Sequence, residues 1–102
     1  VDNAAAVLGL AHKYGNVAAV LQGHAHRYDV RWQKLGARDC AFVVLPAVIE
    51  WPLAWLSLEL SAESVEIELC PLPRPELAAR GNLYSDVRWR AGRTAWRRIR
   101  IA

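Results

Sequence analysis

The sequence contains no methionine, one phenylalanine and only two cysteines, and it has no long uninterrupted apolar run. Because charged residues and prolines interrupt every apolar stretch, no segment is long enough to cross a membrane. The N-terminal residues lack a basic region followed by a long apolar core, so they do not form a signal peptide. We therefore expect a cytoplasmic protein that does not insert into membranes.

The two cysteines do not have the spacing of a metal-binding pair. Cys40 and Cys70 both lie in apolar, strand-like runs, and buried reduced thiols of a cytosolic protein are the favoured interpretation, with a disulfide as the alternative.

The composition is that of a folded domain. With 102 residues, 54% of them hydrophobic, and five tryptophans, the chain can form one small domain with one core and is not disordered. It begins on Val1 and is expected to be a piece of a longer protein.

Charge is distributed unevenly along the chain. Up to Cys70 there are five basic and eight acidic residues, whereas the rest of the chain has eight arginines against two acidic residues. Three explanations remain open: an anionic partner for the tail, an edge strand protected by charge, or a tail that packs on an acidic surface in a larger protein.

The N-terminal third predicts a helix followed by a strand. A helix is expected over Asn3–Tyr14, capped by Asp2 or Asn3 and ended by Gly15. The run "NVAAVLQ" predicts a buried strand near Val17–Gln22, which favours an α/β unit with helices covering a sheet. The apolar face of this helix comprises Val7, Leu10, Ala11 and Tyr14.

Two strand pairs are expected next. "RYDVRWQ" and "CAFVVLP" are predicted to pair through the turn "KLGARD", and the alternating runs "WLSLEL" and "VEIEL" predict a hairpin within Trp55–Leu69 with an apolar and an acidic face. "PAVIEWPLAW" is expected to be a loop, and "PLPRPE" breaks the pattern. Beyond it, two weak strands are expected around Ala91–Gly92. The predicted division is residues 1–72 and an arginine-rich extension over residues 73–102, β or irregular.

The stretch "VLQGHAHRYD" carries the strongest chemical signal. Two histidines, His24 and His26, follow a glycine at the carboxyl end of an apolar strand, which is where α/β sheets commonly bind ligands. On an extended backbone, residues two apart point to the same side, so both imidazoles could reach one metal ion or two neighbouring ions. Asp29 is a candidate third ligand or a solvated strand residue, and His12 is expected to be a surface residue of the helix.

Arg27, Trp51 and Trp55 have two interpretations each, and Glu50 has one. Arg27 is either a contact to a substrate phosphate or, more commonly, a surface strand residue, and Glu50 is expected to be a solvated loop residue. Trp51 and Trp55 are expected to pack the intervening loop onto the core, with substrate stacking as the alternative.

The residues Gly23-His24-Ala25-His26, with the preceding strand and helix, resemble the last signature of the calcineurin-like metallophosphoesterases, and the following hairpins resemble the bacterial phosphodiesterase branch. The resemblance covers about residues 2–71. It implies an α/β fold: part of a metallophosphoesterase α/β/β/α sandwich, with one N-terminal helix followed by mostly antiparallel β-hairpins.

The resemblance also implies a function. His24 would bind one ion and His26 the other ion of a divalent metal pair (Mn, Fe or Zn), which hydrolyses phosphomono- or phosphodiesters in the complete enzyme. The D-x-H, G-D and G-N-H motifs of that family are absent from this chain. No catalytic residue is therefore assigned, and this chain alone is expected to bind metal weakly and to be inactive.

Two other functions compete with this hypothesis. The arginines and tryptophans between Arg88 and Arg98 are typical of a surface that binds single-stranded nucleic acid, although no nucleic-acid-binding motif accompanies them. The exposed apolar surface of a fragment would alternatively serve self-association or binding of the missing N-terminal part, with Trp51, Trp55 and Trp89 as contacts.

Overall fold

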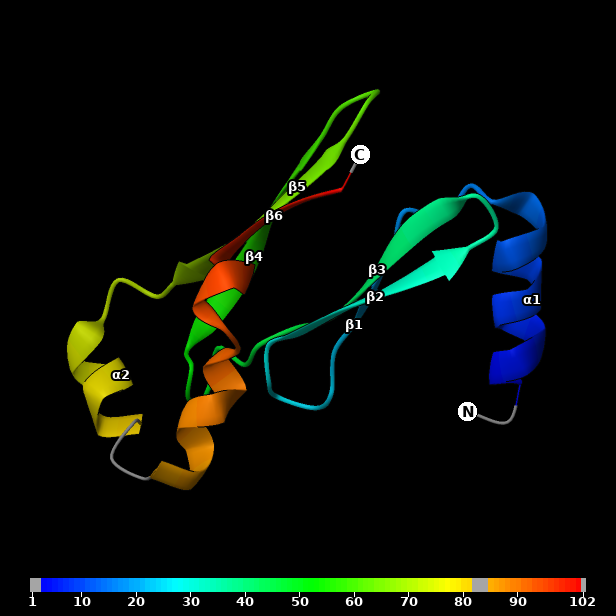
Figure 1. Cartoon of the computed structure of the whole chain (residues 1–102). Coiled ribbons are helices and arrows are strands. Elements are labelled where there is room, and N and C mark those ends of the chain that lie inside the picture. The colour runs from blue at the N-terminus through cyan, green and yellow to red at the C-terminus, as the bar shows by residue number, and fades with distance from the viewer. Residues whose placement is uncertain (1–2, 82–84, 102) are drawn as a thin grey trace.

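The computed structural model describes residues 3–81 and 85–101 of the chain (Figure 1). Its elements are α1 (Ala4–Tyr14), β1 (Ala19–Gln22), β2 (Asp29–Leu35), β3 (Arg38–Val44), β4 (Ala54–Leu60), β5 (Val65–Pro71), α2 (Pro75–Gly81), the 3₁₀ helices η1 (Ser85–Ala91) and η2 (Thr94–Arg97), and β6 (Arg98–Ile101). The fold is therefore α/β, with one N-terminal helix and mostly antiparallel strands in two small sheets. In the part of the chain that is described, no helix is long and apolar enough for a membrane span.

Helix α1 forms where the sequence predicts it. It ends at Gly15, which has a φ of 63° and donates its N–H to the carbonyl of Ala11 at 3.0 Å. This left-handed cap is favourable for glycine because glycine has no Cβ. Asn3 makes no side-chain cap hydrogen bond, and the alternative cap, Asp2, lies outside the described residues.

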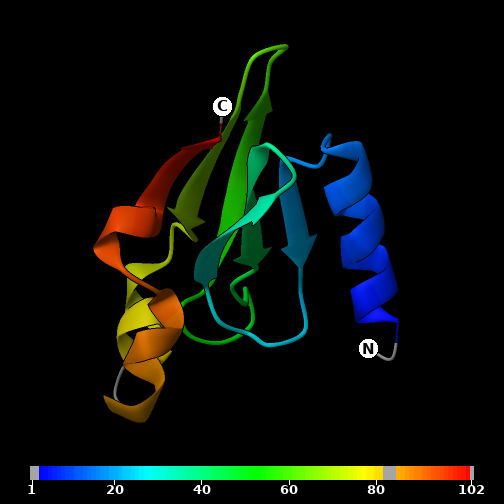
Figure 2. The same ribbon diagram turned by 45° about the vertical axis from the view of Figure 1, so that its right-hand side comes forward.

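The first sheet has the strand order β1-β3-β2. β2 and β3 are antiparallel as predicted, with Val30 opposite Val43, and β1 joins the other side of β3 in parallel. Helix α1 lies beside this sheet, at the end of the molecule away from α2 (Figures 1 and 2). Gly36, in the β2–β3 turn, donates its N–H to Nδ1 of His12 at 2.9 Å, which ties the helix to the sheet.

The second sheet has the order β4-β5-β6 and is entirely antiparallel. The predicted hairpin forms β4 and β5, and its outer face places Glu59 opposite Glu66. β6 brings arginines beside these carboxylates: Arg98 pairs with Glu68 at 3.0 Å, and Arg100 is the register partner of Glu66. The C-terminal strand thus places arginines beside the acidic face of the hairpin within the same chain.

The core lies between the two sheets. Val30 and Val43 of the first sheet pack with Ile67 and Ile101 of the second, and all four are nearly inaccessible to solvent. Tyr28, at 1% exposure, belongs to the same cluster. Its hydroxyl donates a hydrogen bond to the carbonyl of Trp96 at 2.6 Å, and its backbone N–H donates to the carbonyl of Arg90 at 2.7 Å. Tyr28 therefore joins the C-terminal segment to the core.

Two predictions about elements are wrong. The strand expected near Val17–Gln22 forms as β1, but it is not buried: Ala19 and Val20 are half-buried, Leu21 is 41% exposed, and β1 lies at the edge of its sheet. The two strands expected around Ala91–Gly92 are 3₁₀ helices η1 and η2, and a strand forms only at β6. Gly92, with a φ of 75°, reverses the chain between the two 3₁₀ helices and ends any strand pattern there.

The apolar face of α1 is largely uncovered. Val7, Leu10 and Tyr14 are 55%, 56% and 65% exposed, whereas Ala11 is half-buried. Only part of the apolar surface of the helix is therefore covered. The face that the sequence pattern would bury inside one chain points to solvent here.

Candidate metal and anion site

The loop that carries the two histidines connects β1 to β2. His24 and His26 have φ angles of 81° and 54°, in the left-handed region that side chains with a Cβ rarely adopt. Such conformations cost of the order of 1 kcal/mol or more each, and they cluster at functional sites. Both histidines are exposed. The extended backbone assumed for this motif does not form, because these two angles bend the chain, so strand alternation does not govern how the imidazoles are aimed.

A carboxylate holds one of the imidazoles. Nδ1 of His26 lies 2.7 Å from Oε1 of Glu50, in the loop that leads to β4, and the two side chains are about half exposed. A carboxylate oxygen that accepts this hydrogen bond takes it from Nδ1, which leaves Nε2 as the ring nitrogen that could bind a metal. A histidine that binds a metal commonly has its other nitrogen held by a carboxylate in this way.

An arginine holds the carboxylate in turn. Nη1 of Arg90 lies 3.4 Å from the same Oε1 of Glu50, and the backbone of Arg90 is fixed by the N–H of Tyr28. The chain His26–Glu50–Arg90 therefore connects the histidine loop to η1. It orients the ring of His26 from behind and leaves the opposite edge of the ring available.

Asp29 and His12 make other contacts. The carboxylate of Asp29 accepts a hydrogen bond from Nε of Arg31 at 2.9 Å, and His12 accepts one from the β2–β3 turn. Across residues 3–81 and 85–101, no three or more histidine, cysteine or acidic side chains form a metal-binding group. The described residues therefore contribute two exposed histidines in one loop and no complete set of metal ligands.

Sequence reasoning missed Glu50 and Arg90. Glu50 lies 24 residues from His26, and Arg90 a further 40 residues along the chain. Neither has a recognisable motif. Glu50 comes close to His26 because β2 and β3 pair with Asp29 opposite Val44, so the loop before β2 and the loop after β3 lie at the same end of that pair. An acidic residue in the long loop before the hairpin was the available signal, and it also fits a solvated side chain.

Trp51 and Trp55, which follow Glu50 in the chain, differ in burial and in their contacts. Trp51 is half-buried and donates its indole N–H to the carbonyl of Arg88 at 3.3 Å, which packs the loop against η1. Trp55 on β4 is 48% exposed. Loop packing therefore describes Trp51 but not Trp55.

The cysteines take no part in this site. Both are free thiols; Cys40 is fully buried, and Cys70 is half-buried. Burial raises the pKa of the Cys40 thiol, and the positive charge of Arg38 opposes this only in part. The expectation of a buried reduced thiol is confirmed for Cys40.

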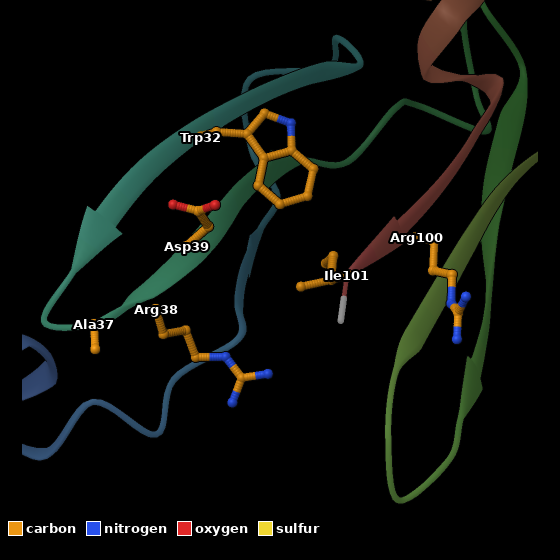
Figure 3. A pocket seen from close by; sticks show the side chains of 6 residues that line it. All are labelled: Trp32, Ala37, Arg38, Asp39, Arg100 and Ile101. Carbon is orange, nitrogen blue, oxygen red and sulfur yellow. The ribbon is translucent and has the colours of Figure 1, made fainter.

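A cavity lies between the two sheets, along β2 and β3 and away from the histidine loop. It has a volume of about 610 Å³ and is lined by Trp32, Ala37, Arg38, Asp39, Arg100 and Ile101 (Figure 3). Ile101 is on the side of Trp32, whereas Arg100 is directed away from it (Figure 3). The described residues that line the cavity include no histidine or cysteine.

No protein-family model matches the chain, and no curated protein or solved structure is significantly similar to it. Interpretation of the site therefore depends on its own residues and geometry.

Proposed function

We propose that this chain is the C-terminal part of a metal-dependent phosphoesterase, a bacterial hydrolase of the calcineurin-like type that cleaves phosphomono- or phosphodiesters. The observation that carries the proposal is the strained G-H-A-H loop with Nδ1 of His26 held by Glu50. A loop that places a histidine in the left-handed region and holds it from behind by a carboxylate is arranged as a metal-ligand loop would be.

Within this proposal, His24 and His26 each supply one imidazole nitrogen to a pair of divalent ions, Mn, Fe or Zn. Imidazole suits all three metals, so the ligands do not select among them. When bound, the metal pair would supply an activated water and neutralise charge on the phosphate. Glu50 and Arg90 are positioning residues: they fix the proton on Nδ1 of His26 and the orientation of its ring.

The proposal also includes a partner. The described residues provide two of the ligands, so the remaining ones would come from further polypeptide, either the N-terminal part of the enzyme or another chain. The exposed face of α1 and the free edge of β1 are suited to such a contact, since edge strands and uncovered apolar faces bind other chains. Hydrolysis by this chain alone is not expected, even with added metal.

Calorimetric titration with Zn²⁺ and Mn²⁺ tests the proposal. We expect weak Zn²⁺ binding that His24→Ala and His26→Ala each abolish. Glu50→Gln keeps the size of the side chain but weakens its hold on His26, so it should reduce affinity by about tenfold or more. His12→Ala removes a histidine outside the loop and is the matched control. Zn²⁺ affinity unchanged by His24→Ala and His26→Ala would contradict the proposal.

A further inference from the structure

A second pocket begins one residue after the histidine loop. It has a volume of about 330 Å³ and lies between the start of β2 and the two 3₁₀ helices. We call it the arginine–tryptophan pocket; its side chains are Arg27, Asp29, Arg31, Trp89, Arg93 and Trp96. This volume is within the range of small-molecule sites.

Positive charge dominates the pocket. Three arginines line it against one aspartate, and Asp29 is already paired with Arg31 at 2.9 Å. Among the side chains that the structure describes, those of residues 3–80 and 88–101, Arg27 and Arg93 form no ion pair with an acidic group. The Nε atom of Arg27 is buried without a hydrogen-bond acceptor in the same part of the chain. Because buried donors are nearly always satisfied in native proteins, this atom calls for an acceptor.

Aromatic surface lies beside these cations. The guanidinium of Arg27 lies 5.8 Å from the ring centre of Trp89, and that of Arg93 lies 5.3 Å from the ring centre of Trp96. Trp89 is 56% exposed, so its indole presents a wide apolar surface at the pocket. Guanidinium groups beside an indole provide the two contacts that nucleotides use, ionic contacts to phosphate and stacking with a ring.

The pocket is next to the candidate metal site along the chain. Arg27 directly follows His26, and Arg90, which contacts Glu50, also lies 5.9 Å from the ring centre of Trp89. A ligand in the pocket would therefore be adjacent to the histidine loop along the chain.

We propose that the arginine–tryptophan pocket binds a nucleoside monophosphate, with phosphate oxygens on Arg27 and Arg93 and the base against Trp89. The inference rests on the proposed function, since it assigns the phosphoesterase a nucleotide class of substrate. Binding in the pocket itself needs no metal, so the two proposals can fail separately.

The test is a titration of the metal-free full chain with adenosine monophosphate, followed by tryptophan fluorescence and calorimetry. We expect Arg27→Gln and Arg93→Gln each to weaken binding by about tenfold, the effect of losing one charge-assisted hydrogen bond. Arg100→Gln removes the same charge on β6, outside the pocket, and should leave affinity within about twofold at moderate salt. Arg93 is exposed, so its variant should fold even if Arg27→Gln disturbs the loop.

Two further comparisons test the aromatic half. Trp89→Leu should weaken binding by about tenfold, whereas Trp55→Leu, which removes a similarly exposed indole from β4, should not. Adenosine and ribose 5-phosphate should each bind at least about tenfold more weakly than the complete nucleotide, since each lacks one of the two contacts.

Three outcomes would overturn the inference. They are no binding of adenosine monophosphate, equal loss of affinity in Arg93→Gln and Arg100→Gln, and affinity for oligothymidylate that rises with length while the mononucleotide fails to bind. The last would favour a nucleic-acid surface instead. If the wild-type chain binds Zn²⁺ through His24 and His26 but does not bind adenosine monophosphate, this inference alone is rejected. If the chain binds adenosine monophosphate but not Zn²⁺, only the proposed function is rejected.

Discussion

Substitution of Gly92 by alanine should destabilise the packing of the C-terminal segment against Tyr28, next to the candidate site. Gly92 lies between η1 and η2 with a φ of 75°, and an added Cβ would approach the carbonyl oxygen of Tyr28 to 2.7 Å and the ring of Trp96 to 2.9 Å. The first contact is with backbone of the loop that leads into β2. Relief therefore requires the C-terminal segment to move away from Tyr28.

The magnitude has two parts. A positive φ costs an alanine about 1–2 kcal/mol, and forcing a methyl group into a packed position costs about 1–3 kcal/mol. Together these give a loss of about 2–5 kcal/mol in the free energy of unfolding. Since domains are stable by only about 5–15 kcal/mol, the variant should be markedly less stable.

Two other glycines serve as controls. Gly15 has a φ of 63° but open space where a Cβ would be, so Gly15→Ala carries the backbone cost without the clash. Gly9 lies in α1 with no atom within 4 Å of an added Cβ, so Gly9→Ala should stabilise the helix by up to about 1 kcal/mol. Stability is expected to fall in the order Gly9→Ala, wild type, Gly15→Ala, Gly92→Ala.

Urea denaturation followed by far-ultraviolet circular dichroism measures the series. A Gly92→Ala protein as stable as Gly15→Ala would refute the reasoning, because it would mean that the Tyr28 backbone does not approach Gly92. A Gly92→Ala protein that does not fold would agree with the upper end of the range.

The remaining predictions concern Tyr28, the two cysteines and the apolar face of α1. Burial raises the pKa of Tyr28 to about 12, so stability should fall as pH rises between about 10 and 12, where unfolding releases the phenolic proton. Tyr28→Phe should remove this fall in the free energy of unfolding with rising pH. An unchanged fall in the variant would contradict its assignment to Tyr28. Cys70 should react with a thiol reagent in the folded protein well before Cys40, because Cys40 is fully buried and its thiol pKa is raised. The chain should self-associate in sedimentation experiments and Leu10→Lys should weaken this; a stable wild-type monomer at all concentrations would count against it.

The hairpins and the helix end could be predicted because local patterns determine them. Alternation in β4 and β5 puts Leu56 and Ile67 on the same apolar face and excludes a shift of one residue, which would expose that whole face. Gly15 ends α1 because it can adopt the left-handed cap without strain. In both cases the deciding interactions are short-range in sequence.

The burial of β1 and the structure of the C-terminal segment could not be predicted in the same way. An apolar run such as "NVAAVLQ" predicts a strand, but its burial depends on which other strands flank it, and here β1 lies at an edge. The alternating "RWR" of residues 88–90 looks like a strand. It folds as a 3₁₀ helix because Arg90 and Gly92 pack against Tyr28 from outside the segment.

The candidate site was predicted in part for a related reason. His24 and His26 follow a recognisable glycine at the end of a strand, so their placement in one exposed loop could be expected. The carboxylate beside His26 could not, since Glu50 lies in an irregular loop after β3, and no local sequence pattern indicates which side chain of that loop reaches His26. Motifs identify atoms that react with ligands, whereas the residues that orient those atoms carry little signal of their own.

The arginine-rich tail illustrates why net charge alone left three explanations open. Antiparallel register places Arg98 and Arg100 beside glutamates of β5, where they relieve the repulsion between facing carboxylates. Arg90 contacts the glutamate behind the histidine loop, and Arg93 lines the pocket next to that loop without an acidic partner in the described parts of the chain. Because β6 and the preceding turns hold these side chains at different distances from acidic groups, the arginines differ in their partners. Of the four, Arg93 is the one placed in the pocket and not beside a glutamate of the described residues. The same excess of arginine therefore pairs with a glutamate of β5, contacts the carboxylate beside His26 and lines a pocket next to the histidine loop.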